Sequence, residues 1–350
     1  MKNRQYSLDF LKIIATLFIL FHHYQQFVSN VFDSGINYYG GIFNFGYMVE
    51  LFFILSGFFM FPYMERVKNG LTFKKFFATR YLRLIPLVAI TAFAYQFFSF
   101  IHIKLVGAAW FMYSRDIWST LVASLGFQEG WVFVDNTYVN YPVWYISVLL
   151  VCYILFYFVT YLSQKLKISS RYFYLGLIFL GIAIISYGWN FPFMNIYNAR
   201  GYYAFFTGVL LSTYYFERNT TKRESLICAC ITITLIGLIV FKYNLVSNGI
   251  SYLCTFILFP AIVLLFKSSA ICKIFSHKIY QTLASIAFNA FLWHMTLIVI
   301  LLTIAKAVTT GINFLCRPSM WCFAIISFLV GTASYFLLEK NINKWLKKYL

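Results

Sequence analysis

The chain has few charged residues for its length. Only 11% of its 350 residues are charged, whereas a soluble chain has about 25%. So few charges cannot cover a water-facing surface, which excludes an ordinary soluble globular protein. The 61% of hydrophobic residues instead indicate a polytopic membrane protein.

Acidic residues and paired cysteines are also scarce. Ten acidic residues stand against 28 basic ones, which gives a net charge of +18. Because there is no basic soluble domain, this excess favours topology signals and anion ligands, and we expect no nucleic acid partner. The seven cysteines are scattered and form no CxxC pair. We therefore expect buried thiols, no metal site and no resident cofactor.

Long apolar runs, in contrast, are frequent. A spanning helix needs about 20 mostly apolar residues, so the sequence predicts an all-α membrane bundle of about ten transmembrane helices. They are expected at residues 8–28, 42–62, 83–104, 142–162, 172–189, 201–216, 226–242, 249–266, 281–305 and 319–338. Because the sequence pattern indicates no soluble domain, residues 1–350 are predicted to form a single transmembrane domain.

The Lys and Arg residues are distributed unevenly between the two sides of this bundle. If the N-terminus is cytoplasmic, 21 of the 28 cations fall on inner segments. The positive-inside rule then predicts that both termini are cytoplasmic. We expect a multi-pass protein of the cell membrane, such as a bacterial inner membrane. One long, aromatic-rich outer segment, residues 105–141, is predicted to be an ordered lid.

The first predicted helix carries ionisable residues that hydrocarbon disfavours. Lys12 and His23 fall within about 20° of one helical face, together with Thr16 and, nearby, Asp9, whereas His22 is rotated away. Ionisable groups in spans usually face a bundle interior or a wet cavity, and His is the natural general base near neutral pH. The alternative is that Asp9 and Lys12 only extend to the membrane interface.

Other ionisable residues occur along the chain. Arg80 and Arg83 lie in a basic run at the start of the third predicted helix, where phosphates are common partners, although topology alone also places cations there. Glu50 needs a partner or a proton within the bilayer, and Arg200 lies at a matching depth. His294 is a third intramembrane imidazole, which is as compatible with a helix–helix hydrogen bond as with catalysis.

Seven segments follow one another in a characteristic order: LDFLKIIATLFILFHHY, MVELFFILSGFFM, FKKFFATRYLRLIP, YPVWYISVLLVCYILFY, ARGYYAFFTGVLL, LASIAFNAFLWHMTL and FLLEKNINKW. In this order they resemble the acyltransferase family 3. These are integral membrane acyltransferases, many of which O-acetylate cell-surface polysaccharides. The resemblance extends from residue 8 to about residue 345.

The resemblance implies roles for the residues at matching positions. The family's first-helix motif, an Arg and a catalytic His separated by ten residues, selects His23 and puts Lys12 where Arg is usual. Arg80 and Arg83 match a pair that is expected to bind the acyl-CoA donor. The other matching positions are Glu50, Ser56, Arg200 and His294. After Trp144, the glutamate that many members carry is absent.

The sequence therefore predicts an O-acyltransferase that moves acetyl from acetyl-CoA to a sugar hydroxyl of a surface polysaccharide or its lipid-linked precursor. His23 is the expected base, beside Asp9 and Lys12, and Lys12 is also a candidate for the donor phosphates. Direct transfer and an acyl-histidine intermediate both stay open. Ser56, Trp144 and Tyr145 are candidate oxyanion donors.

Two other functions are compatible with the same sequence. A glycan or lipid transporter or flippase would also need many helices and intramembrane charges, but it predicts interrupted helix pairs or internal symmetry, and neither is apparent. The other alternative is a catalytically degraded partner within a polysaccharide synthase complex. The expected partners are acyl-CoA, the glycan acceptor and membrane lipids in every enzymatic case.

Overall fold

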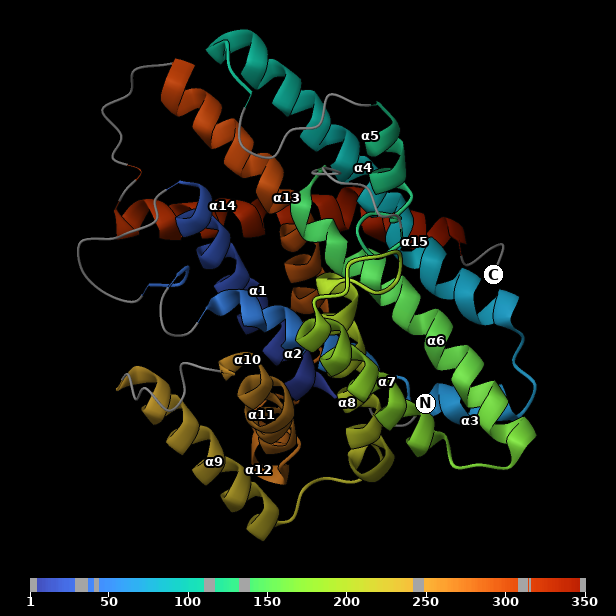
Figure 1. Ribbon diagram of the computed structural model, residues 1–350. Coiled ribbons are helices and arrows are strands. Elements are labelled where there is room, and N and C mark those ends of the chain that lie inside the picture. Colours follow the sequence, from blue (N-terminus) through green and yellow to red (C-terminus); the bar gives the residue numbers. More distant parts are fainter. Residues whose placement is uncertain are drawn as a thin grey trace.

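The computed structural model describes residues 5–28, 37–40, 44–109, 117–131, 139–241, 249–307, 314 and 316–346. Within these ranges the chain forms helices and no named β-strand (Figure 1). The all-α prediction is therefore confirmed for the described part of the chain.

The elements run along the chain in the following order. They are α1 (Tyr6–Phe27), η1 (Phe45–Tyr47), α2 (Met48–Phe58), α3 (Phe61–Lys68), α4 (Phe73–Val106), α5 (Ile117–Ser124), η2 (Tyr141–Val143), α6 (Trp144–Leu166), α7 (Ser170–Tyr187), α8 (Ile196–Tyr215), α9 (Lys222–Val240), α10 (Ile250–Leu253), η4 (Cys254–Leu258), α11 (Phe259–Leu265), α12 (Ser269–Ile274), α13 (Ile279–Ala307), α14 (Arg317–Ser334), η5 (Tyr335–Glu339) and α15 (Lys340–Leu346).

Each of the ten predicted segments coincides with helix, but not each is long and apolar enough to cross a membrane. Among the described residues, seven helical segments meet that criterion, and the bent pair Phe45–Phe58 and Phe61–Lys68 makes an eighth if it counts as one span. These apolar helices indicate a multi-pass membrane protein. The count of ten spans and the side on which the termini lie are not confirmed and stay predictions.

The two remaining segments fall short for different reasons. Helix α8 has 20 residues, but polar side chains such as Asn198 and Arg200 lower its hydropathy. The apolar segment Ile250–Leu265 rises only about 24 Å, which is less than the roughly 30 Å of a hydrocarbon core.

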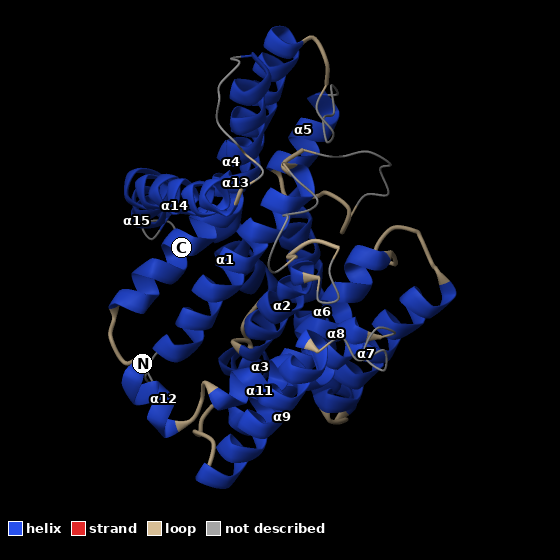
Figure 2. Cartoon of the chain, turned by 90° about the vertical axis from the view of Figure 1, so that its left-hand side faces the viewer, coloured by secondary structure: helices blue, strands red, loops and turns tan. Residues whose placement is uncertain are grey.

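The predicted lid lies partly outside the described residues. The described portion contains α5 and the turn that follows it as far as Trp131, whereas residues 110–116 and 132–138 are outside the described ranges. Both views show α5 beside α4, at the end of the molecule toward which α4 and α13 extend (Figures 1 and 2).

Helices α2 and α8 approach each other more closely than ordinary side chains allow. A Cβ atom at Gly57 would lie 2.0 Å from the carbonyl oxygen of Phe205, and one at Gly208 would lie 2.0 Å from that of Ile54. The two glycines therefore let the two backbones touch, as small residues do in membrane bundles. This contact fixes the position of Glu50, which lies on the same helix as Gly57, relative to α8.

Candidate active site

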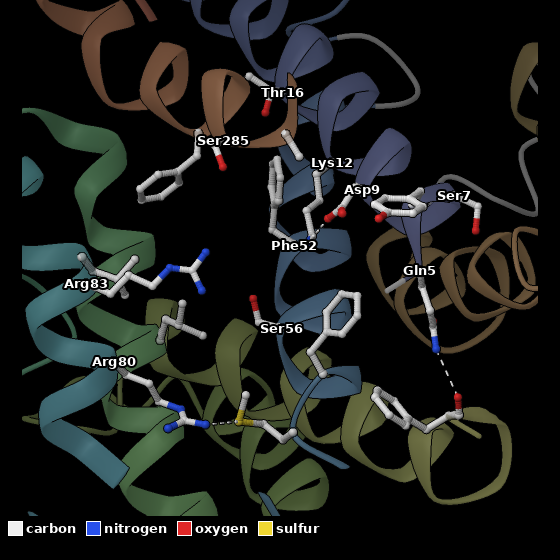
Figure 3. Close-up of a pocket in the computed structure, with 18 of the residues that line it drawn as sticks. Gln5, Ser7, Asp9, Lys12, Thr16, Phe52, Ser56, Arg80, Arg83 and Ser285 are labelled. Carbon is white, nitrogen blue, oxygen red and sulfur yellow. Dashed lines mark hydrogen bonds and ion pairs between the residues drawn. The ribbon is translucent and has the colours of Figure 1, made fainter. Parts of the chain in front are cut away.

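A cavity of about 1160 Å³ opens between the helices of the bundle (Figure 3). Five long helices line it, α1, α2, α4, α6 and α13, each with residues at helical spacing. Tyr145, Leu149 and Tyr153, for example, project from one face of α6 at intervals of four residues. The start of α1 and the end of η5 border the same cavity, through Gln5 and Glu339.

The polar stripe of α1 faces this cavity. Asp9, Lys12 and Thr16 all line it, as their spacing predicts. The Nζ atom of Lys12 lies 3.0 Å from an oxygen of Asp9 and 4.6 Å from the ring centre of Phe59. Asp9 is almost fully buried, whereas the side chain of Lys12 keeps 29% of its surface exposed. The ammonium group is thus accessible from the cavity while its counter-ion holds it in place.

Arg80 and Arg83 occupy different environments although they are three residues apart on α4. Arg80 is buried between the rings of Tyr63 and Phe76, at 3.9 and 3.8 Å, and donates a hydrogen bond to the carbonyl of Phe76. Arg83 is exposed and points into the cavity (Figure 3). Its guanidinium makes no hydrogen bond or ion pair with any described residue, so it is available to a ligand.

Lys267 is a cavity-lining cation that the sequence offered only as a topology signal. It follows the apolar segment Ile250–Leu265, is 4% exposed, and donates a hydrogen bond to the carbonyl of Phe216. Burial lowers the pKa of its ammonium group to about 8. Its position directly after an apolar run was the available sequence signal. Acidic residues of the cavity, Glu217 and Glu339, partly offset its cations.

Ser56 and Tyr145 form a hydroxyl pair on the cavity wall. Their oxygens are 3.0 Å apart, and the Tyr145 hydroxyl also lies 3.5 Å from the carbonyl oxygen of Phe52. Trp144, the third residue expected near them, is not among the cavity-lining residues. Its ring lies instead 5.0 Å from the guanidinium of Arg200.

Three buried imidazoles lie together beyond the end of the cavity that Thr16 and Phe291 border. The ring of His23 lies 5.1 Å from that of His294 in a stacked arrangement and 5.0 Å from that of His22. The structure thus brings His294 to the candidate base. The ring of His22 lies as close to His23 as that of His294 does, although the helical stripe places His22 on another face.

Each imidazole uses Nδ1 toward an oxygen. The partners are the amide oxygen of Gln26 for His23, at 2.9 Å, the carbonyl of Phe291 for His294, and the carbonyl of Tyr38 for His22. Because these oxygens only accept, each Nδ1 carries a proton, and in the neutral imidazole this leaves the lone pair on Nε2. As neutral groups, the three imidazoles can therefore accept protons at Nε2.

Glu50 and Arg200 make the ion pair that their depth predicted. Arg200 donates two hydrogen bonds to the carboxylate, at 2.6 and 2.8 Å, and one to the carbonyl of Gly46, at 3.0 Å. Tyr203 donates a further bond to Glu50. A Cβ atom on Gly46 would lie 3.1 Å from Cε1 of His22, so this backbone packs directly against the imidazole cluster. The pair thereby fixes the wall behind His22.

Within the described ranges, no group of three or more His, Cys, Asp or Glu side chains has an arrangement that could hold a metal ion. The described site residues instead divide into a cation-lined cavity and a buried cluster of imidazoles. A cavity with accessible cations can bind an anionic ligand, and a neutral imidazole can accept a proton from a hydroxyl group.

A comparison with known protein families agrees with this chemistry. The model of the acyltransferase family 3, described as an acyltransferase domain, matches residues 5–339, which is nearly the whole chain. The match includes every candidate site residue. No curated protein and no solved structure matches the chain significantly.

Proposed function

We propose that this chain, which belongs to the acyltransferase family 3, transfers acetyl from acetyl-CoA to a sugar hydroxyl of a cell-surface polysaccharide or its lipid-linked precursor. The family establishes a membrane acyltransferase. The donor, the acceptor and the catalytic residues are the proposal, as is the location in the cell membrane.

One observation carries the proposal: a cavity with accessible cations leads toward a buried histidine whose Nε2 is free. Arg83 and Lys12 line the cavity with accessible cationic groups and would bind the phosphates of the donor. Lys267, whose ammonium group is buried against the carbonyl of Phe216, would add positive charge to the same cavity. Arg80 would support this wall from behind, because its guanidinium is already held between aromatic rings.

His23 is proposed as the general base. Its Nε2 accepts the proton of the sugar hydroxyl while the oxygen attacks the thioester carbonyl. A carbon–oxygen bond forms, the carbon–sulfur bond breaks, and the thiolate takes the proton from His23 to leave as free CoA. In the acyl-histidine route Nε2 attacks the thioester carbonyl first, so that a carbon–nitrogen bond forms, the carbon–sulfur bond breaks and CoA leaves. The sugar oxygen then attacks the acyl carbonyl, the carbon–nitrogen bond breaks, and the imidazole leaves with the proton of the hydroxyl group. Ser56 and Tyr145, whose hydroxyl groups meet on the cavity wall, would donate hydrogen bonds to the oxyanion in either route.

The test is acceptor-dependent release of CoA by the purified full chain in detergent. Acetyl-CoA and a surface glycan preparation are supplied, free thiol is measured, and the glycan is checked for added acetyl by mass. His23→Ala is expected to lose about 10²–10⁴ in rate, as removal of a general base does.

His22→Ala is the matched control and should cost less than His23→Ala, because His22 lies beside the proposed base and not in its place. A larger loss for His22→Ala would overturn the assignment. If both variants add acetyl at the wild-type rate, the inactive-partner alternative is favoured. Release of CoA in near-stoichiometric amount without acceptor would identify the acyl-histidine route.

A further inference from the structure

Three aromatic rings meet on the cavity wall, and one of them, Phe291, also contacts the imidazole cluster. Phe52 of α2, Tyr145 of α6 and Phe291 of α13 all line the cavity. Their ring centres form a nearly equilateral triangle, with separations of 6.0 Å for Phe52–Tyr145 and 6.1 Å for the two others. At such distances aromatic rings are in contact and leave no open passage between them. We call Phe52, Tyr145 and Phe291 the ring triangle.

The ring triangle separates two groups that the proposed reaction must bring together. Phe291 borders the cavity on one side and contacts His294 on the other, with ring centres 5.7 Å apart. His23 stacks on the far face of this assembly, against His294. None of the three imidazoles lines the cavity. On α1 the cavity ends at Thr16, seven residues and therefore about 10 Å before His23.

A thioester in the cavity must approach closely to react. Reacting atoms need to come within about 3–3.5 Å, so the acyl group has to enter the ring triangle and displace at least one ring. Each further methylene on the acyl chain requires a larger displacement in a packed aromatic layer, and overfilling such a layer is unfavourable. The barrier therefore discriminates by the length of the acyl group.

We infer that the ring triangle restricts the donor to short acyl groups, and that Phe291 is its principal specificity-determining residue. This inference deepens the proposed function and rests on it. Phe291 is the member that touches both the cavity and the imidazole cluster, and its ring has no polar atom that would bind it to a neighbour. Tyr145 is held by Ser56 through its hydroxyl group.

The experiment compares acetyl-CoA with butyryl-CoA in wild-type protein and in Phe291→Ala. Wild type is expected to prefer acetyl-CoA by about tenfold or more in kcat/KM for each added methylene, in the range typical of a hydrophobic pocket. Phe291→Ala should reduce the acetyl-to-butyryl ratio by at least tenfold. Phe288→Ala is the matched control: the residue is on the same helix and lines the same cavity, but it lies outside the triangle, so its ratio should stay that of wild type.

A second variant makes the result independent of a folding defect in Phe291→Ala. A second readout makes it independent of whether the proposed reaction occurs. Phe52→Leu removes an aromatic ring from the α2 side of the ring triangle and should also lower the acetyl-to-butyryl ratio of kcat/KM. Binding of S-ethyl-CoA and S-butyl-CoA, thioethers that cannot transfer an acyl group, is measured by calorimetry in the same proteins. The preference for the shorter thioether should fall in Phe291→Ala and Phe52→Leu but not in Phe288→Ala.

The outcomes distinguish a failure of the proposed reaction from a failure of the inference about the ring triangle. If the thioether preference behaves as expected but no protein transfers an acyl group, the proposed reaction fails and the barrier stands. If wild type shows no length preference, or if both triangle variants keep the wild-type ratio, the ring triangle does not select the donor and the inference is overturned.

Discussion

The charged residues of the cavity and those around the imidazole cluster differ in how they are paired. Around the cluster, Arg200 binds Glu50 through two hydrogen bonds and also binds the backbone at Gly46, so that α8, α2 and the turn before α2 are joined. In the cavity, Lys12 is paired with Asp9 of its own helix, and Arg83 contacts no described residue by hydrogen bond or ion pair. One set of charges therefore joins structural elements around the cluster, and the other is the set for which we propose a role in ligand binding.

The largest expected effect is a difference in stability between variants of the Glu50–Arg200 pair and of the Asp9–Lys12 pair. Arg200→Ala leaves the buried Glu50 without its partner and should lower the free energy of unfolding by about 3–5 kcal/mol. Lys12→Ala removes a cation whose side chain keeps 29% of its surface exposed. The loss should be smaller, about 1–3 kcal/mol, which is the cost of taking one partner from a buried acceptor such as Asp9. Denaturant unfolding in detergent measures both.

The double substitution Glu50→Leu with Arg200→Met is the control, since replacing a buried pair by apolar side chains removes the unpaired charge. It should recover most of the stability that Arg200→Ala loses. Equal losses for Arg200→Ala and Lys12→Ala would contradict the distinction between the two pairs.

The second prediction separates the two arginines of α4. Arg83→Ala should raise the KM for acetyl-CoA by roughly ten- to a hundredfold, the effect of about 1.5–3 kcal/mol from a hydrogen bond to a charged group. Its kcat and its melting temperature should stay near those of wild type, because Arg83 holds no other element in place.

Arg80→Ala is the counterpart of that experiment. It removes a guanidinium packed between Tyr63 and Phe76, so the protein should lose stability as well as donor affinity. The comparison fails if Arg83→Ala is the less stable of the two variants, or if only Arg80→Ala changes the KM.

The smallest effect concerns pH. Burial lowers the pKa of Lys267 to about 8, so its ammonium group is charged below pH 8 and loses its charge as the pH rises through that value. The KM for acetyl-CoA should therefore increase by roughly fivefold between pH 7 and pH 9, for about 1 kcal/mol of lost attraction. Lys267→Met should show a higher KM at pH 7 and little change up to pH 9. A wild-type profile that is flat over this range would exclude Lys267 from donor binding.

Much of this arrangement could be predicted from the sequence where helical periodicity decides it. The spacing of Asp9, Lys12 and Thr16 places them on one cavity face. Apolar runs predict a helix at each of the ten expected positions, whereas the short helices α3, α5, α12 and α15 lie mainly outside those ranges. The pairing of Glu50 with Arg200 followed from the cost of burying a lone charge, which left few partners at that depth.

The remainder depends on packing between distant segments, which periodicity does not encode. Nothing in the local pattern around Arg80 shows that Tyr63 and Phe76 enclose it while Arg83 faces the cavity. The position of Trp144 against Arg200 likewise depends on how α6 and α8 meet. The ring triangle takes one residue from each of three helices, so no single segment reveals it.

The touching backbones of α2 and α8 have a mechanical consequence for the reaction. With Gly57 and Gly208 leaving no space between them, these two helices can only move as one body. Phe52 belongs to that body, and the hydroxyl of Ser56 couples Tyr145 to it. In the reaction that we propose, turning of the Phe291 ring on α13 would admit the acyl group toward His23 without a rearrangement of the bundle.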